Sequence, residues 1–387
     1  MAKANTRLPF DSLLLGSVLL LLLFSVMMVG SASLDVASVR FGSPWHIILR
    51  WCVYIPLGLL LMWAVANIHP SWWEALVMPL LMISFVLLIG LLLLGSEING
   101  ATRWFSVLGM SVQPVEFVKP VFILYLAYYL AQFPERLHHF AHGLMPMLVM
   151  LTLLLALLLG QPDFGNVVLL FVVSMCLWFV GGVPMRHLMG VLLIFVPIIV
   201  VVAIAAPYRL QRILTFMDPW ADRFGSGYQL VQSEIAFGVG GLTGAGLGQG
   251  VQKLFYLPES FTDFIAAVIG EELGLMGILA LLMVFAVLLW RGISIALAAD
   301  KAFSRYLALG CTLLLAFSLM INMGAAMGLI PTKGMPMPFI SYGGSALLGS
   351  CILVGLLFSV QRHQEGNVRK KTSSRSSLYP IVEGAKP

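Results

Sequence analysis

The feature that most constrains this chain is a series of long apolar runs, each close to the length that crosses a lipid bilayer. A crossing helix needs about 20 mostly apolar residues, and about ten runs meet that requirement. They cover residues 13–30, 47–66, 76–94, 114–130, 144–159, 167–180, 189–206, 264–290, 306–330 and 339–360. Only 10% of the 387 residues are charged, against about 25% in a soluble domain. The sequence therefore predicts an all-α polytopic membrane protein with about ten transmembrane helices.

The distribution of lysine and arginine predicts which side of the membrane each end occupies. An even number of crossings puts both termini on one side, and cytoplasmic segments carry an excess of these residues. With both termini inside, the inner segments hold Lys3, Arg7, Arg136, Arg186, Arg291, Lys301, Arg305 and the basic tail. We therefore expect a cytoplasmic N-terminus (1–10), a transmembrane domain (11–361) and a basic cytoplasmic tail (362–387).

The longest connection, residues 207–263, lies between the seventh and eighth predicted helices on the extracytoplasmic side. Loops of this length are usually functional or disordered. This one is rich in glycine and aromatic residues and contains short apolar stretches such as residues 230–237. We expect it to be ordered, with short helices lying at the membrane interface.

Several functional classes find no support in the sequence. The glycine-rich stretch at 238–250 lacks the Gly-Lys-Ser/Thr of a phosphate-binding loop and follows no predicted strand. It is interpreted as backbone that turns sharply, with close approach to a ligand as the alternative. The basic residues form no recognition element for nucleic acid, and the histidines and cysteines form no zinc motif. Nucleotide, nucleic-acid and zinc functions are therefore not predicted.

The outer segment after the third run carries charged residues beside an apolar run. Arg103 and Trp104 precede that run, and Glu116 and Lys119 stand near its beginning. Arg103 and Lys119 are candidates for holding a phosphate, and Trp104 for stacking on a sugar. Because Glu116 and Lys119 are three residues apart, a structural ion pair on one helix face is an equal alternative. Charges in membrane segments, however, tend to face cavities and to mark function.

Two further clusters lie on the same side of the membrane. Arg209 and Arg212 can clamp a pyrophosphate if their segment is helical, or they can anchor it at lipid headgroups. Asp163 joins two runs in a stretch with proline and glycine, where a tight turn explains it better than a role in a site.

The long loop ends in an acidic cluster. Glu259 and Asp263 lie just before the eighth run, which carries two more glutamates. Ser260 and Asp263 fit a helix-capping arrangement, but several acids at one helix entrance near lipid favour a functional role. The connection between the ninth and tenth runs adds two polar residues among flexible glycines, Lys333 and Ser341.

Together these segments resemble the SEDS family (shape, elongation, division and sporulation) over nearly the whole chain. The motifs are GATRW, QPVEFVK, QPDFG, PYRLQRI, FGSGYQLVQS, GLGQGVQKLFYLPE, TDF, GEELG, PTKG and PFISYGGS. The sixth and the last two are more similar to the division members, the FtsW type, than to the elongation members, the RodA type. Phe261 and Ala266 depart from the family pattern, in which histidine and an aromatic residue are common.

The resemblance implies a ten-helix fold in the bacterial inner membrane at the division septum, with both termini cytoplasmic. It implies a peptidoglycan glycosyltransferase that polymerises lipid II into glycan strands. A class B penicillin-binding protein and other membrane proteins of the division machinery are the implied partners. The essential aspartate proposed for the family falls on Asp263, its cavity lysine on Lys119 and the PTKG lysine on Lys333.

The chemistry needs few groups. A carboxylate acting as general base on an acceptor hydroxyl contributes about 10²–10⁴-fold, and Asp263 is the predicted base. The undecaprenyl-pyrophosphate leaving group needs charge stabilisation from cations, and a divalent cation (Mg²⁺ or Mn²⁺) is the one cofactor that this step accommodates. A single displacement inverts the anomeric carbon. The predicted substrate contacts and their supports are Lys119, Arg103, Trp104, Glu116, Arg209, Arg212, Glu259, Lys333 and Ser341.

Two other functions remain open from the residues alone. A flippase or transporter of the lipid-linked precursor would use the same cationic cavity but would need no base. A scaffold that only recruits division partners would need neither.

Overall fold

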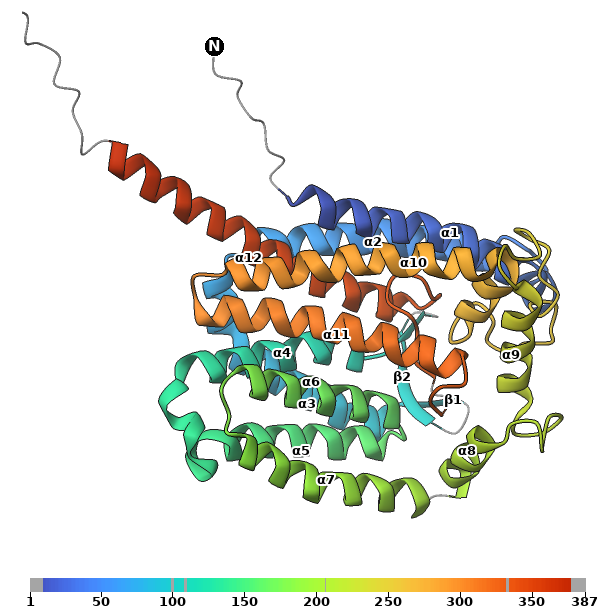
Figure 1. The fold of residues 1–387 in the computed structure, drawn as a ribbon, viewed down its shortest axis with the longest axis horizontal. Helices are drawn as coiled ribbons and strands as arrows, with labels where there is room; N and C mark the ends of the chain where they lie inside the picture. Colours follow the sequence, from blue (N-terminus) through green and yellow to red (C-terminus); the bar gives the residue numbers. More distant parts are fainter. Residues whose placement is uncertain (1–9, 99–100, 108–109, 206, 332–333, 377–387) are drawn as a thin grey trace, which may run out of the picture.

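The computed structural model describes residues 10–98, 101–107, 110–205, 207–331 and 334–376, and most of them are helical (Figure 1). The long helices are α1 (Ser12–Phe41), α2 (His46–Asn67), α3 (Pro70–Leu94), α4 (Val115–Gln132), α5 (Met145–Gly160), α6 (Phe164–Val180), α7 (Met185–Ala205), α10 (Ile265–Ala298), α11 (Ala302–Ala326) and α12 (Gly344–Ser376). Among the described residues, eight helical segments are long and apolar enough to cross a membrane. With α4 and the shorter α6 they match the predicted runs, so the predicted polytopic fold is confirmed.

The helices lie side by side with α4 near the centre, where it packs against α3, α11 and α12 (Figure 1). One end of the bundle, here called the loop end, holds residues 95–98, 101–107, 110–114, 161–163, 207–264, 327–331 and 334–343. The opposite end, the terminal end, holds the short connections at 133–144, with the helices η1 (Pro134–His138) and η2 (Phe140–Leu144), and at 299–301. Every outer segment of the sequence prediction therefore meets at the loop end.

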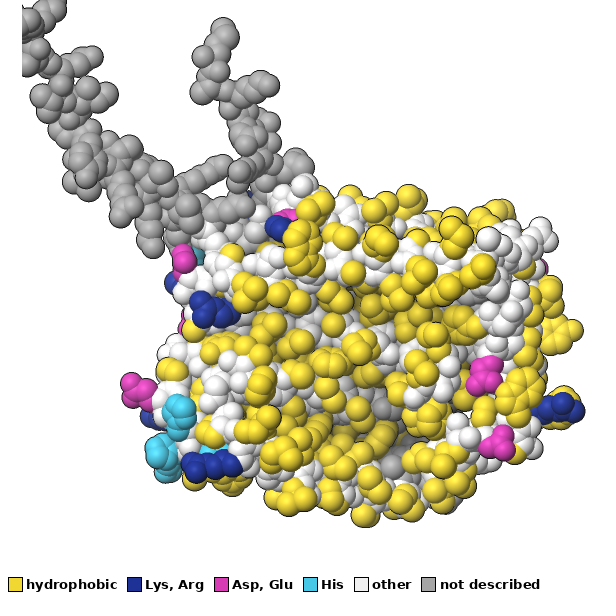
Figure 2. Space-filling view, in the orientation of Figure 1, with side chains coloured by type: hydrophobic (Ala, Val, Ile, Leu, Met, Phe, Trp, Pro, Cys, Tyr) yellow, Lys and Arg dark blue, Asp and Glu magenta, His cyan; other side chains and the backbone are white. Residues whose placement is uncertain are grey.

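The surface of the bundle is apolar in the way that lipid requires. Figure 2 shows hydrophobic side chains over most of one face, with charged side chains near its two ends. Large apolar residues on the outer helices are well exposed, including Leu93 (78%) and Leu193 (77%). A lipid environment makes this exposure favourable, because the hydrocarbon core is as apolar as the side chains.

The outer segment before α4 differs from the prediction, which placed no strands in this chain. It forms a small antiparallel sheet of β1 (Ser96–Ile98), β2 (Ala101–Val107) and β3 (Met110–Val112), in that order. Trp104 pairs with Ser96, and Phe105 with Val112. The threonine, tryptophan, phenylalanine and valine of β2 have high strand propensity, and outside the hydrocarbon region their backbone need not be helical.

The long loop contains the two short helices that the sequence predicted, α8 (Pro207–Met217) and α9 (Tyr228–Gly240). Helix α8 follows α7 and contacts mainly that helix, at the edge of the bundle (Figure 1). Helix α9 packs against α10 and buries Leu230, Val231 and Ala236. Helix α9 is therefore part of the packed loop end, and the position of both helices at the membrane interface stays a prediction.

Helix α10 is broken at Gly274, whose φ of 63° lies in the left-handed region that glycine tolerates. The break frees backbone groups, and the loop at 241–246 bonds to them. The N–H groups of residues 245 and 246 donate to the carbonyls of 271 and 272, and those of 275 and 276 donate to the carbonyls of 241 and 242. The first part of α10 is thus fixed to the loop end rather than free in the membrane.

Candidate functional site

Asp263 lies at the entrance of α10, at the end of a series of turns. The N–H groups of Thr262 and Phe264 both donate to the carbonyl of Glu259, at 3.2 Å each, and Glu259 has a left-handed φ of 57°. Phe264 is the first residue at the helix boundary, and no side chain caps it. The alternative in which Ser260 and Asp263 serve only to cap the helix is therefore not found among the described residues. The carboxylate of Asp263 accepts no hydrogen bond from the described residues, and Ser260 instead donates to the carbonyl of Ala32, at 3.5 Å.

The surroundings of the Asp263 side chain set its pKa. Burial raises the pKa of this carboxyl to about 7, and the neighbouring charge of Glu259 adds to the rise. The charges of Arg103 and Arg212 oppose it and lower the pKa. Glu259 is itself exposed and accepts a hydrogen bond from the Thr262 hydroxyl at 2.6 Å. Near neutral pH, the Asp263 carboxyl is thus divided between its neutral and ionised forms.

Arg103 projects from β2 and is half-buried. Its Nε donates to the carbonyl of Gln161 at 3.3 Å, and its Nη2 donates to the carbonyl of Pro162. These bonds fix the guanidinium to the turn between α5 and α6 while its charge acts on Asp263. Trp104 is the next residue of β2 and is also partly exposed. The sheet that the sequence did not predict is therefore the element that positions both residues.

The two arginines of the long loop that are predicted to clamp a pyrophosphate lie on α8. Arg209 and Arg212 belong to this helix, which confirms the helical segment that a pair of clamping arginines requires. Arg212 is exposed and acts electrostatically on Asp263. The side chain of Arg209 and the whole of Lys333 lie outside the described residues, so their proposed contacts stay predictions.

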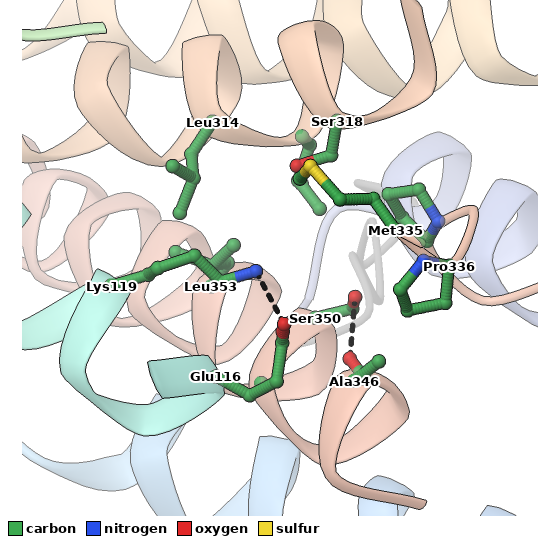
Figure 3. A pocket seen from close by; sticks show the side chains of 12 residues that line it. Glu116, Lys119, Leu314, Ser318, Met335, Pro336, Ala346, Ser350 and Leu353 are labelled. Atoms are coloured by element: carbon green, nitrogen blue, oxygen red, sulfur yellow. Dashed lines mark hydrogen bonds and ion pairs between the residues drawn. The ribbon is translucent and has the colours of Figure 1, made fainter. Parts of the chain in front are cut away.

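Glu116 and Lys119 form the ion pair that their spacing predicted. Lys119 Nζ lies 2.6 Å from Glu116 Oε1, and both side chains are buried. They line a narrow cavity between α4, α11 and α12, with Ser318 and Ser350 on its other walls (Figure 3). The cavity has room for about one water molecule, which excludes a sugar or a pyrophosphate from this space as it stands.

Two residues that were considered for the site accept hydrogen bonds from residues close to them in the chain. Asp163 is the N-cap of α6 and accepts from the N–H and the side-chain amide of Asn166. The predicted tight turn is confirmed. Ser341 is buried, and its hydroxyl accepts from the N–H of Met337 at 2.8 Å. This bond fixes a turn before α12 and favours a structural role for Ser341.

The glycine-rich stretch wraps around the two glutamates of α10. The N–H groups of Val251 and Gln252 donate to the Glu271 carboxylate, and that of Gly248 donates to the Glu272 carboxylate. A Cβ on Gly244 would lie 2.2 Å from the Glu272 carbonyl, so only glycine fits there. The interpretation as sharply turning backbone is confirmed.

Lys253 closes this arrangement from a buried position. Its Nζ lies 2.6 Å from Glu272 Oε1 and donates to Ser31 of α1 and to the carbonyl of Gly248. The loop is thereby tied to α1 and α10 together. Sequence reasoning had noted the glutamates but assigned them no role. A buried charge near lipid is costly unless paired, and that cost was the available indication that partners existed.

A second connection reaches Asp263 from α11. The side-chain amide of Asn322 donates to the carbonyl of Asp263 at 3.0 Å and to that of Met335 at 2.7 Å. Asn322 is 1% exposed. A Cβ on Gly334 would lie 3.1 Å from Asp263 Oδ2, so the segment before α12 passes directly beside the carboxylate. The sequence prediction missed Asn322, although an asparagine within an apolar run is itself unusual.

Fold and site together define a polytopic membrane protein with a charged site outside its membrane-spanning segments. In this site Glu259, Arg103 and Arg212 act on the carboxyl of Asp263. The chain belongs to the FtsW/RodA/SpoVE family of cell cycle proteins, whose model matches residues 11–366. It is 40% identical over 356 residues to the probable peptidoglycan glycosyltransferase FtsW of Legionella pneumophila, covering 91% of this chain and 90% of that one. The resemblance found in the motifs is thus confirmed.

Solved structures support the same assignment. One is a chain from a study of the structural coordination of polymerization and crosslinking by a peptidoglycan synthase complex. It matches with a TM-score of 0.77 at 28% identity, over 92% of this chain and 99% of that one. The rod shape determining protein RodA of Thermus thermophilus matches with a TM-score of 0.69 at 25% identity, over 92% and 97% of the two chains.

Proposed function

We propose that this protein is a peptidoglycan glycosyltransferase that polymerises lipid II into glycan strands during cell division, with Asp263 as the general base. The observation that carries the proposal is the state of the Asp263 carboxyl. It lies at a helix entrance without a capping hydrogen bond, among cations, with a pKa raised to about 7. A general base is most effective when its pKa is near the working pH. Membership in a family whose relatives are named glycosyltransferases supports the reaction class.

In the proposed reaction, the ionised Asp263 accepts the proton of the acceptor sugar hydroxyl as its oxygen attacks the anomeric carbon of the donor. The bond from that carbon to the lipid pyrophosphate breaks, and the configuration inverts. Negative charge then develops on the departing pyrophosphate. Arg103 and Arg212 are the described cations close enough to influence Asp263, and they are the groups proposed to stabilise this charge. Arg209 and Lys333 are proposed to join them.

The energy of the reaction comes from the donor's own bond to pyrophosphate, so no nucleotide is needed. The described residues contain no group of three or more histidine, cysteine or acidic side chains that would hold a metal ion. Mg²⁺ often takes only one or two carboxylates together with substrate phosphates. Asp263 and Glu259 are the carboxylates that would serve such an ion, which would supply further charge neutralisation at the pyrophosphate.

The proposal includes a location and a partner. The loop end faces outward and both termini lie in the cytoplasm, in the inner membrane at the division septum. This orientation is supported by the lysine and arginine residues at the terminal end, such as Arg136, Arg186 and Arg291. A class B penicillin-binding protein is the proposed partner, together with other division proteins. The similarity to a chain of a complex that couples polymerization to crosslinking supports this pairing.

The orientation is tested by labelling with a membrane-impermeant maleimide. Phe224 lies in the long loop and is 83% exposed, so Phe224→Cys in a Cys52→Ser background should react from outside the cell. A tag after Pro387 should be reached only after the membrane is opened. Labelling of the tag in intact spheroplasts would show that the orientation is the opposite one. The proposed active site would then lie on the wrong side of the membrane for its substrate.

The reaction is tested by lipid II polymerisation with purified protein and its penicillin-binding partner, read as glycan length on a gel. Asp263→Asn keeps the size of the side chain but removes the base, so we expect a loss of about 10²–10⁴-fold. The matched control is Asp163→Asn, which should stay within about threefold because asparagine caps a helix as well as aspartate does. If folded Asp263→Asn protein made polymer of normal amount and length, the role of Asp263 as general base would be refuted. Transfer of lipid II across vesicles by that variant would then establish the flippase alternative.

A further inference from the structure

One amide group connects the entrance of α10 to the segment before α12. Asn322 lies on α11 near its end, and its Nδ2 donates both of its hydrogens: one to the carbonyl of Asp263 and one to that of Met335. These two acceptors are far apart in sequence and belong to different connections at the loop end. Asn322 thus joins three elements of the bundle at the residue that carries the proposed base.

We propose that Asn322 is a positioning residue, which holds the Asp263 backbone against the 334–335 segment and so fixes where the Asp263 carboxylate points. This inference rests on the proposed function of Asp263. It concerns the Asp263 main chain, and Asn322 itself touches neither sugar nor pyrophosphate in this role. The expected consequence of losing Asn322 is a misplaced base in a folded protein.

The chemistry of the two acceptors fixes the orientation of the amide. Carbonyl oxygens accept hydrogen bonds, so the nitrogen of Asn322 must face them and its oxygen must face away. That oxygen, Oδ1, is buried and has no hydrogen-bond partner among the described residues. A buried polar atom without a partner is costly. The arrangement therefore gives up one favourable contact of Asn322 in order to keep two bonds to loop backbone.

The rest of the surroundings explains why such a connection matters. The turns around Asp263 are held by backbone bonds to the Glu259 carbonyl, and no described side chain caps the helix, so bonds from other segments add to what fixes the position of Asp263. Helix α11 is well placed to supply one, because Asn322 sits among buried neighbours, including Leu319 and Met323. On the other side of the carboxylate, Gly334 leaves just enough space: a Cβ there would lie 3.1 Å from Asp263 Oδ2.

Two substitutions of Asn322 test the inference in the polymerisation assay with the full chain and its partner. Asn322→Asp keeps the shape but places an oxygen, in place of the donating nitrogen, against both carbonyls, and Asn322→Leu keeps the branching of the side chain without any donor. Displacement of a reacting group by about 1 Å costs on the order of 100-fold. We therefore expect kcat to fall about 10- to 100-fold while the KM for lipid II stays within about twofold.

The matched control is Thr312→Val on the same helix, which removes a buried hydroxyl whose hydrogen bond runs to Ala308 within α11. It should lower the melting temperature slightly and leave kcat unchanged. If folded Asn322 variants keep a normal kcat while Asp263→Asn is inactive, the positioning role is overturned and the proposed base stands. If Asp263→Asn is active, the proposed function itself fails. The two failures are thus distinguishable.

A second approach avoids the buried position. Gly334 is exposed, so Gly334→Ala should fold normally, yet its methyl group would press on the Asp263 carboxylate. We expect kcat to fall by about threefold or more at an unchanged melting temperature. A normal kcat in Gly334→Ala would show that the carboxylate is not held against this segment, and would overturn the inference even if the Asn322 variants failed to fold.

Discussion

Two helix entrances at the loop end look alike in sequence and differ in structure. Asp163 stands before α6 and Asp263 before α10, each at the end of a turn and each followed by a phenylalanine and an apolar run. Asp163 is 2% exposed and caps its helix, with both of its oxygens bonded to Asn166. Asp263 caps nothing and has a pKa raised to about 7. The same local pattern therefore gives a structural helix cap at Asp163 and, at Asp263, a carboxylate that is free of local hydrogen bonds from the described residues.

The difference comes from residues that other segments deliver. At the α6 entrance the hydrogen bonds to the Asp163 carboxylate come from the same segment, because Asn166 lies in the first turn of the helix. At the α10 entrance the neighbours are Glu259, whose charge repels, and two arginines from β2 and α8. Arg103 connects the two regions, since it donates to the backbone of the first and acts on the carboxylate of the second. The Asp263 carboxylate, which has no local hydrogen bonds from the described residues, keeps its oxygens available for the substrate hydroxyl that a general base must reach.

The largest expected effect concerns pH. If Asp263 is the base, kcat/KM of polymerisation should rise with pH to a plateau above about 7, and should fall about tenfold per unit below it, because the carboxyl is protonated there. The Asp163→Asn variant should keep this profile, whereas Asp263→Asn should be low and flat. A rate that does not change between pH 5 and pH 8 would contradict the difference drawn between the two entrances.

The next effect is that of Arg103→Met, which removes the charge but keeps the length of the side chain. The Arg103 charge lowers the pKa of Asp263, so its loss should raise that pKa and move the rise of the rate profile to higher pH. At pH 7 we expect a loss of about tenfold, including the weaker hold on the pyrophosphate. Arg103→Lys keeps the charge, and its profile should stay at the wild-type position. An unshifted pH–rate profile in Arg103→Met would show that Arg103 does not link the α6 entrance to the Asp263 carboxylate.

A smaller effect is expected on stability at the α6 entrance. Asp163→Ala removes the cap of α6 and leaves the Asn166 amide without its partner, which should lower the free energy of unfolding by about 1–2 kcal/mol. Thermal unfolding in detergent measures this loss, with Asp163→Asn as the control that retains the cap. An Asp163→Ala protein with wild-type stability would show that this aspartate is not structural.

The last effect is the pH dependence of stability at the α10 entrance. A carboxyl whose pKa is raised in the folded state binds more protons when folded than when unfolded, so its contribution to stability is lost as pH rises toward about 7. The pKa rise corresponds to about 4 kcal/mol, so Asp263→Asn, which carries no charge, should melt about 5 °C above the wild type at pH 8 and equally at pH 4. If Asp263→Asn were less stable than the wild type at pH 8, the ionised Asp263 carboxylate would have stabilising partners.

The membrane fold and the segments that form the site followed from the composition and motifs of the chain alone. Apolar runs of sufficient length are forced into helices across a bilayer, because lipid offers no partners for free backbone groups. The spacing of Glu116 and Lys119 likewise predicted their ion pair, since residues three apart on a helix meet. The motifs named the family and singled out Asp263, and local turn chemistry explained Asp163.

Which polar groups find hydrogen-bond partners could be learned only from the folded bundle. The capping role considered for Asp263, the sheet that carries Arg103, and the two bonds donated by Asn322 all depend on contacts between segments distant in the chain. A local pattern fixes which bonds a side chain is able to make. Whether it makes them depends on the partners that the folded bundle brings within about 3 Å. For that reason, the motifs assigned different roles to the two helix entrances, but the hydrogen bonds that distinguish them are seen only in the folded bundle.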